Sequence, residues 1–200
     1  MSDEVKTAKS DNPEEKHHHH GGKFSEGLLD KELILNALDI QPGQKIIDAG
    51  CGNGYMSKAF ADKATYSGKV YALDHDKHYL GILKRETEGT NVEAIECDIT
   101  RSIPIDQASA DLIYISTVIH GFSKEQLQAF LAEVKRLLKP NGVLAIVEIE
   151  KKETPFGPPL NLRFSPEELR EVVPMPPLGT IEVGKHFYMQ MFKNTEKPED

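Results

Sequence analysis

Long apolar runs, cysteine pairs and an excess of basic residues are all missing from this sequence of 200 residues. No apolar run approaches the length that crosses a membrane, and the polar, charged beginning of the sequence contains no secretory signal. The two cysteines, Cys51 and Cys97, make no disulfide framework, so we expect a reducing, cytoplasmic setting. The formal net charge of −8 argues against nucleic acid as a partner, because binding to a phosphate backbone requires lysine and arginine. With 38% hydrophobic residues, the chain can build the core of one ordinary globular domain.

A change in polarity near residue 22 predicts the domain organisation. Residues 1–22 are charged and polar, which is typical of a mobile leader, whereas residues 23–194 have the composition of a single domain and residues 195–200 form a charged tail. The leader contains a histidine tract, His17–His20. Four consecutive imidazoles cannot all face one metal ion, and no cysteine or carboxylate at ligand spacing completes a site. We therefore predict no metal site and interpret the tract as an expression tag or a solvated polar segment.

The sequence is organised around residues 46–55, which read Ile-Ile-Asp-Ala-Gly-Cys-Gly-Asn-Gly-Tyr. The pattern predicts a buried strand that ends in an acidic residue and continues through a tight turn into a helix. The glycines Gly50, Gly52 and Gly54 allow backbone conformations closed to other residues and let a ligand approach the main chain. The N–H groups at the start of the next helix favour a negative or polar ligand group. The alternative is an ordinary glycine-rich turn without a ligand.

The next expected strand, residues 69–73, helps to discriminate between nucleotide ligands. It runs into Asp74, twenty residues after Gly54, where a carboxylate can accept hydrogen bonds from both ribose hydroxyls. The dinucleotide pattern is G-x-G-x-x-G, but here the glycines alternate and residue 55 is a tyrosine. The spacing therefore disfavours a nicotinamide dinucleotide.

Expected helices and strands alternate along the chain, which predicts an α/β fold with a parallel, doubly wound sheet. Ligands of such sheets bind at the carboxyl ends of the strands. The run at 139–142, Lys-Pro-Asn-Gly, is interpreted as a helix stop followed by a turn. The expected helices are 31–38, 55–64, 77–88, 124–138 and 165–172, and the expected strands are 46–49, 69–73, 91–96, 111–116 and 142–150, with a closing hairpin of 181–183 and 186–192.

The glycine-rich run after Asp48, followed by a strand that ends in Leu-Asp at Asp74, resembles the S-adenosylmethionine-dependent methyltransferases of the Rossmann-like class. Asp98 and the run Leu-Lys-Pro-Asn-Gly-Val-Leu at 138–144 extend the resemblance, which covers about residues 23–192. In detail, the sequence is similar to the small branch that includes ubiquinone/menaquinone-pathway C-methyltransferases and arsenite methyltransferases. The resemblance implies a doubly wound, mostly parallel, seven-stranded sheet with an antiparallel final hairpin. The arsenite branch holds its metalloid with several thiolates, which the two cysteines of this chain do not provide at their positions.

The resemblance also implies a site for S-adenosylmethionine and its product, S-adenosylhomocysteine. Asp74 would bind the ribose hydroxyls, Asp98 would accept from the adenine amino group, and Ile99 would contact the ring. Each of three residues also has an interpretation without a ligand: Asp98 can cap a turn, Asp48 can be a solvated strand end, and His75 can simply be exposed. The predicted cofactor-binding residues are Asp48, Gly50, Cys51, Gly52, Asn53, Gly54, Asp74, His75, Asp98, Ile99 and Ser116.

The acceptor side of the site is less defined. His120, just past the fourth expected strand, is a candidate base or acceptor contact because histidine titrates near neutrality, and a structural histidine is the alternative. One of Glu148 and Glu150 can face the site, but alternation along the strand does not say which. The proline- and glycine-rich segment 151–164 can form a lid or a passive connection. Related proteins carry a polar stretch that ends in Lys-Phe, as at residues 23–24, and folds over the cofactor.

Together these features predict an enzyme that transfers a methyl group from S-adenosylmethionine to a small-molecule acceptor by in-line displacement. A macromolecular acceptor is disfavoured because no added domain is present. Two alternatives stay open: a non-catalytic or metal-linked S-adenosylmethionine-binding regulatory protein, and a nicotinamide-dependent oxidoreductase. The sequence leaves the accepting atom and the oligomeric state undefined.

Overall fold

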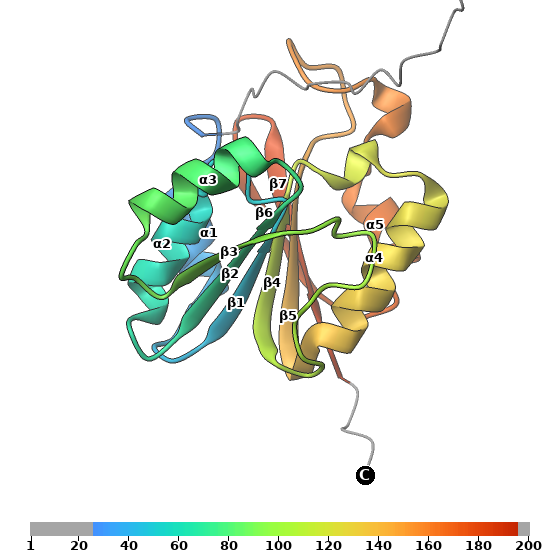
Figure 1. Cartoon of the computed structure of the whole chain (residues 1–200). Coiled ribbons are helices and arrows are strands. Elements are labelled where there is room, and N and C mark those ends of the chain that lie inside the picture. The colour runs from blue at the N-terminus through green and yellow to red at the C-terminus, as the bar shows by residue number, and fades with distance from the viewer. Residues whose placement is uncertain (1–25, 196–200) are drawn as a thin grey trace, which may run out of the picture.

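A computed structural model describes residues 26–195 (Figure 1). The expected leader (1–22), its tract His17–His20 and the Lys-Phe pair at 23–24 lie outside the described residues, as does the tail beyond residue 195. What we predict for these segments therefore stays a prediction.

Within residues 26–195 one seven-stranded sheet has the order β3-β2-β1-β4-β5-β7-β6. Strand β7 runs antiparallel to both β5 and β6, and the other neighbouring strands are parallel. The predicted fold class, a mostly parallel doubly wound sheet with an antiparallel final hairpin, is confirmed. The strands are β1 (Lys45–Ala49), β2 (Lys69–Asp74), β3 (Val92–Glu96), β4 (Ala110–Ser116), β5 (Leu138–Ile149), β6 (Pro177–Gly184) and β7 (Phe187–Lys193). The helices are α1 (Lys31–Leu38), α2 (Tyr55–Ala64), α3 (Lys77–Glu86), α4 (Lys124–Leu137) and α5 (Pro166–Val172), with short 3-10 turns η1 (Ile119–Gly121) and η2 (Leu160–Leu162).

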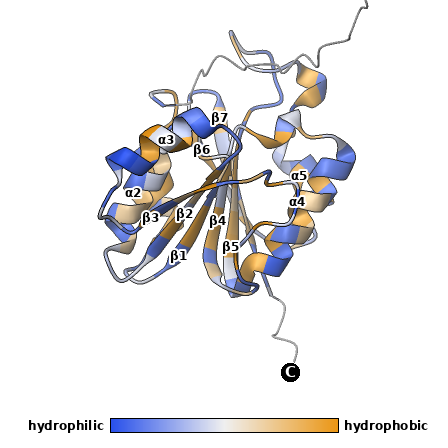
Figure 2. Cartoon of the chain, in the orientation of Figure 1, coloured by the Kyte–Doolittle hydropathy of each residue, from blue (hydrophilic) through white to orange (hydrophobic). Residues whose placement is uncertain are grey.

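Helices cover both faces of the sheet, α4 and α5 on one and α1, α2 and α3 on the other (Figure 1). Successive strand residues point to opposite faces, so β1 contributes to two cores. Ile47 belongs to the core that includes Phe130 of α4, whereas Ile46 belongs to the core that includes Phe60 of α2. The central strands are accordingly apolar along much of their length, and the helices carry their hydrophilic residues outward (Figure 2).

Parallel pairing aligns the carboxyl ends of the central strands at one edge of the sheet. Ala49 at the end of β1 pairs with Leu73 of β2 and with Ile115 of β4. Ile115 in turn pairs with Ile146 near the end of β5. The segment 150–164 leaves β5 at this edge and rises beyond the strand ends (Figure 1). The predicted site residues follow these strand ends, so this edge is where a site can form.

Side-chain caps explain where the two helices on the β5 side begin. Ser123 and Gln126 form a capping box at the start of α4, and Ser165 and Glu168 form another at the start of α5. The helix start predicted at residue 165 is confirmed. Among the described residues, no helix has both the length and the apolar character needed to span a membrane.

The turn predicted at 139–142 is wrong, because these residues lie within β5. They form an irregularity where the β4–β5 register shifts. Asn141 takes a left-handed conformation (φ 66°), and its N–H donates to the Asn194 carbonyl oxygen at 2.7 Å. The Asn194 N–H donates back to the Gly142 oxygen at 2.8 Å. Pairing with the chain beyond β7, which local sequence signals do not reveal, keeps this segment in the sheet.

Candidate functional site

The glycine-rich loop between β1 and α2 lies on the end of β2. The N–H groups of Gly50 and Cys51 both donate to the Leu73 carbonyl oxygen, at 2.8 and 2.9 Å. Gly54 has a φ of 72°, and a Cβ atom there would stand 2.3 Å from Leu83 Cδ1. A side chain at this position would be strained and would collide with α3, so the loop requires glycine.

Asp74 and the glycine-rich loop are brought together as predicted. One carboxylate oxygen of Asp74 accepts the Gly52 N–H at 2.8 Å, and the other accepts the Asp76 N–H at 2.9 Å. These bonds fix the carboxylate at the mouth of the loop. The neighbouring His75 side chain is 89% exposed, and its Nδ1 lies 3.6 Å from Asp74 Oδ1. Its placement matches the exposed alternative, and a cofactor contact by His75 stays a prediction.

Asp48 is buried beneath the loop, so the alternative of a solvated strand end is wrong. The Ser57 hydroxyl of α2 donates to Asp48 Oδ2 at 2.5 Å. Burial raises the pKa of Asp48 to about 7; the charge of Asp74 adds to the rise, and the bond from Ser57 opposes it. Burial and the same two carboxylates raise the pKa of the Cys51 thiol, which therefore stays uncharged. Two acidic side chains, Asp48 and Asp74, thus lie close together at the glycine-rich loop.

Asp98 lies exposed past the end of β3 and is engaged in its own turn. Its carboxylate accepts from the Thr100 N–H and hydroxyl, at 2.9 and 2.7 Å, and from Arg101 Nε at 3.2 Å. The Thr100 hydroxyl, its N–H and Arg101 together lower the pKa of Asp98. Ile99 is buried in the core beneath α4. The turn-capping alternative for Asp98 therefore describes its present contacts, and the adenine role stays a prediction.

Asn53 connects the loop to a residue that sequence reasoning missed. Its Oδ1 accepts the Tyr55 N–H at 3.1 Å, and its Nδ2 donates to Glu26 Oε2 at 2.8 Å. Lys31 of α1 lies 5.3 Å from the centroid of the Tyr55 ring. The segment that leads into α1 thus touches the start of α2, a contact for which the sequence contains no signal.

The loop after β4 lies against the glycine-rich loop. A Cβ atom at Gly50 would stand 2.8 Å from Val118 Cγ2, two residues before His120. The Nδ1 atom of His120 lies 2.8 Å from Glu148 Oε2, and the Glu148 side chain has no exposed surface. Glu150, by contrast, pairs with Lys152 at 2.6 Å. The structure therefore selects Glu148 as the strand-β5 carboxylate that accompanies His120.

Ser116 ends β4, close to this histidine turn. The Thr117 N–H that follows donates to the Val147 carbonyl oxygen at 2.8 Å, which holds the strand end against β5. Burial raises the pKa of the nearby Tyr114 phenol, and the Ser116 hydroxyl beside it lowers that pKa in part. Ser116 thus lies at the end of β4 beside the histidine turn, and its predicted cofactor contact stays a prediction.

The segment after β5 is organised around Arg163, a second residue that sequence reasoning missed. Arg163 is only 5% exposed, and Gly157 passes close by with a φ of 104°. The segment is therefore folded around one buried cation over the end of β5, whereas its composition alone suggested either a lid or a passive connection. The guanidinium donates to the carbonyl oxygens of Pro158 (2.7 Å), Glu150 (3.0 Å), Lys152 (2.8 Å) and Phe156 (3.1 Å) and to the Thr154 hydroxyl (2.9 Å).

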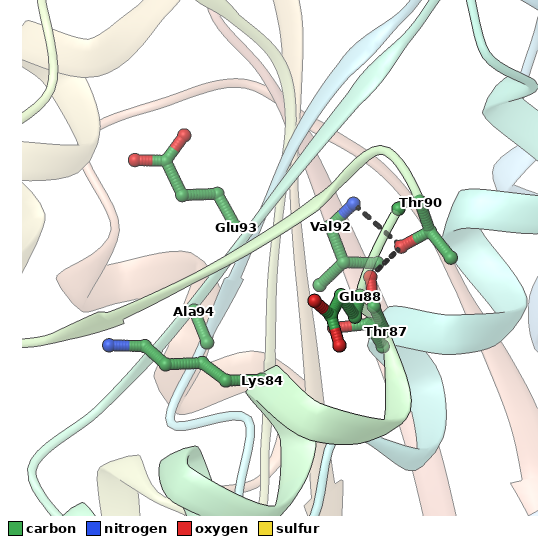
Figure 3. A pocket seen from close by; sticks show the side chains of 8 residues that line it. Lys84, Thr87, Glu88, Thr90, Val92, Glu93 and Ala94 are labelled. Carbon is green, nitrogen blue, oxygen red and sulfur yellow. Dashed lines mark hydrogen bonds between the residues drawn. The ribbon is translucent and has the colours of Figure 1, made fainter.

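A depression of about 400 Å³ lies elsewhere, where α3 leads into the amino end of β3 (Figure 3). Its wall includes Thr90, whose hydroxyl donates to the Thr87 oxygen at 2.8 Å and accepts the Val92 N–H at 3.2 Å. It contains none of the predicted site residues. Over the described range 26–195, no group of three or more histidine, cysteine, aspartate and glutamate side chains is arranged to hold a metal ion.

Comparison with known proteins agrees with this geometry. Residues 46–142, which include the glycine-rich loop, Asp74 and His120, match a family model described as a methyltransferase domain. An uncharacterized methyltransferase of Synechocystis sp. is 32% identical over 64% of this chain and 58% of its own length. A ubiquinone/menaquinone biosynthesis C-methyltransferase of Cupriavidus metallidurans is 29% identical over 63% of this chain and 51% of its own length. This chain thus spans about half the length of such relatives.

Solved structures extend the similarity to nearly the whole fold. The crystal structure of an S-adenosylmethionine-dependent methyltransferase from Aquifex aeolicus superimposes with a TM-score of 0.75 at 26% identity. The match covers 86% of this chain and 94% of that protein. These comparisons support the predicted cofactor and do not favour an oxidoreductase or a purely regulatory protein.

Proposed function

We propose that this chain, a member of the Rossmann-like S-adenosylmethionine-dependent methyltransferases, transfers the methyl group of that cofactor to a small-molecule acceptor. The observation that carries the proposal is the contact between two loops. The glycine-rich loop, tied to Asp74, meets the loop after β4 at Val118, and His120 follows two residues later. A cofactor held by the first loop and an acceptor beside the second would therefore be neighbours.

The residues around the glycine-rich loop fit an adenosyl group with a cationic substituent. Asp74 is fixed by two main-chain N–H groups, and each of its oxygens retains capacity to accept from a ribose hydroxyl. The Asp74 carboxylate favours a positively charged ligand nearby, and a positive charge would in turn favour the ionised form of the buried Asp48. Gly50, Gly52 and Gly54 all have a positive φ, which lets the loop turn tightly at this edge of the sheet.

On the acceptor side, the residues position and desolvate the nucleophile. The bound cofactor supplies an activated sulfonium methyl group, so in-line displacement depends mainly on positioning. Arg163 folds the segment 150–158 over the end of β5, which supports a role for it as a wall of the acceptor site. His120 contributes a ring nitrogen on the same side. We place the reaction in the cytoplasm, since both cysteines are free thiols.

Methyl transfer is tested by incubating the full chain with methyl-labelled S-adenosylmethionine and a fractionated extract of small metabolites. We expect label in at least one small-molecule fraction, together with formation of S-adenosylhomocysteine. A D74N variant serves as the control, since it should lose labelling through weaker cofactor binding. Tight cofactor binding without labelling of any fraction would instead favour the regulatory alternative.

A further inference from the structure

Four carboxylates, two at the end of β5 and two in the first turn of α5, differ in their counter-charges. Three of them have a lysine or arginine partner within the described residues. The fourth, Glu148, has none. The three pairs are Glu150 with Lys152 (2.6 Å), Glu167 with Arg170 (2.6 Å) and Glu168 with Lys151.

Glu148 is the most deeply buried of the four, with no exposed side-chain surface. Its Oε2 meets His120 Nδ1, and its Oε1 has no hydrogen-bond partner in the described part of the chain. Tyr188 pairs with Glu148 across the β5–β7 ladder, but its hydroxyl donates to the Phe164 oxygen at 2.7 Å. Burial, and then the charge of Glu148, raises the pKa of Tyr188. Thus the imidazole of His120 is the group beside Glu148 that can supply a compensating positive charge.

The geometry defines which nitrogen of His120 is available to a ligand. An ionised Glu148 can only accept, so with this carboxylate 2.8 Å from Nδ1 the neutral ring carries its proton on Nδ1 and Nε2 keeps a free lone pair. The His120 side chain is 22% exposed, so the ring is accessible from outside. A proton taken up at Nε2 would create an imidazolium next to a buried carboxylate, which stabilises it.

We propose that Glu148 and His120 form a carboxylate–imidazole base and that the methyl acceptor is a neutral weak acid, such as a phenol, an enol or an N–H heterocycle. The inference rests on the proposed function. The acceptor X–H bond breaks and its proton moves to His120 Nε2. The X–C bond forms as the C–S bond breaks, and the C–S electron pair stays on sulfur. His120 then releases the proton to solvent, and Glu148 acts as a positioning residue.

The same arrangement disfavours acceptors that are already anions. Iodide and thiocyanate need no base, and a buried carboxylate without a fixed cation repels a neighbouring negative charge. Such acceptors have no proton for His120 to remove. The presence of the Glu148–His120 pair therefore favours a protic acceptor.

The first test reads the tautomer of His120 directly and needs no acceptor. Nitrogen-15 NMR of histidine-labelled protein, with the signal assigned through H120Q, should show the proton on Nδ1. In E148M, which removes the acceptor while keeping an apolar side chain of similar size, the proton should move to Nε2. The matched control E150M, two residues along β5, should leave the tautomer unchanged. An Nε2–H tautomer in the wild-type protein, or no change in E148M, overturns the proposal.

The second test compares acceptors. Catechol and histamine are the protic probes, and iodide and thiocyanate are the anionic probes. We expect methylation of a protic probe that falls about 10²–10⁴-fold in H120Q. The affinity of H120Q for S-adenosylhomocysteine should not change, which separates loss of the base from misfolding. Methylation of iodide or thiocyanate that is independent of His120 refutes the base but leaves methyl transfer intact. Failure of the wild-type chain to bind S-adenosylhomocysteine refutes the proposed function itself.

Discussion

The two halves of the candidate site are built in different ways. On the cofactor side, main-chain N–H groups hold the loop, as where the N–H groups of Gly50 and Gly52 meet the Leu73 carbonyl and the Asp74 carboxylate. On the acceptor side, ionisable side chains supply the contacts, as where His120 meets Glu148 or the guanidinium of Arg163 binds the carbonyl of Glu150. Main-chain recognition suits a cofactor shared by many enzymes, whereas the acceptor half is formed by side chains that can change with the substrate.

The largest expected effect comes from disrupting the cofactor half alone with G54A. The new Cβ would combine a left-handed φ with a collision against Leu83, so the free energy of unfolding should fall by about 2–4 kcal/mol. Urea denaturation of G54A and the wild-type protein measures this difference in the free energy of unfolding. The matched variant G81A, in α3 with no heavy atom within 4 Å of its Cβ, should instead gain about 0.5–1 kcal/mol. Equal effects of the two substitutions would contradict the close packing described for the loop.

The next effect tests the acceptor half. R163M removes the buried guanidinium that binds the segment 150–158, so that stability should fall by about 2–3 kcal/mol. Amide hydrogen exchange should accelerate within this segment, while the affinity for S-adenosylhomocysteine stays within about twofold. R170M, which removes an exposed ion pair to Glu167 and long hydrogen bonds to Thr180 and Gln190, should cost about 1 kcal/mol or less. Loss of cofactor affinity in R163M would show that the two halves are not separable.

Asp48 predicts a pH dependence that belongs to the cofactor half. Its pKa is about 7 when folded, against an ordinary value of 3.8, so the folded state holds a proton that the unfolded state has released. The free energy of unfolding should therefore fall by about 2 kcal/mol between pH 5 and pH 7 through this residue. Denaturation of D48N across this range should show a correspondingly smaller fall. Identical pH profiles for D48N and the wild-type protein would contradict the raised pKa of the buried Asp48 carboxyl.

The smallest effect isolates one predicted cofactor contact. D74N removes the charge and one acceptor of the carboxylate at the loop mouth, so affinity for S-adenosylmethionine should fall about tenfold, or about 1.4 kcal/mol. Glu96 pairs with Asp74 across the β2–β3 ladder but is exposed, which makes E96Q the matched control with unchanged affinity. Isothermal titration calorimetry compares the two variants. Weakening by E96Q as strong as that by D74N would point to a general charge effect in place of a specific contact.

The difference between the halves also explains what the sequence could predict. The strand, glycine-rich loop and Asp74 follow from short-range signals, because one turn and one parallel neighbour bring them together. Glu148 could be named but not selected, since its partner His120 meets it only after β4 and β5 have paired. Arg163 gave no signal, because its acceptors are mostly carbonyl oxygens, which every residue carries.

Sequence signals also failed where distant main-chain groups override local preference. Asn141 and its neighbours have turn chemistry, yet they stay in β5 because Asn194 pairs with them beyond the end of β7. The exposure of His75 beside Asp74 is one of the two alternatives that the sequence left open, and its cofactor contact stays a prediction. For Asn141 the outcome depends on which segments meet in the folded chain, and a local pattern does not contain that information.

Calorimetric titration of the full chain with S-adenosylhomocysteine, with NAD as the comparison ligand, shows whether the glycine-rich loop and Asp74 bind the methyltransferase cofactor. We expect micromolar binding of S-adenosylhomocysteine and no heat of binding with NAD. The glycines alternate and Asp74 is fixed at the mouth of their loop, a spacing that differs from the G-x-G-x-x-G pattern of dinucleotide sites. Binding of NAD alone, or of neither ligand, would contradict the assignment of the loop and the methyltransferase function built on it.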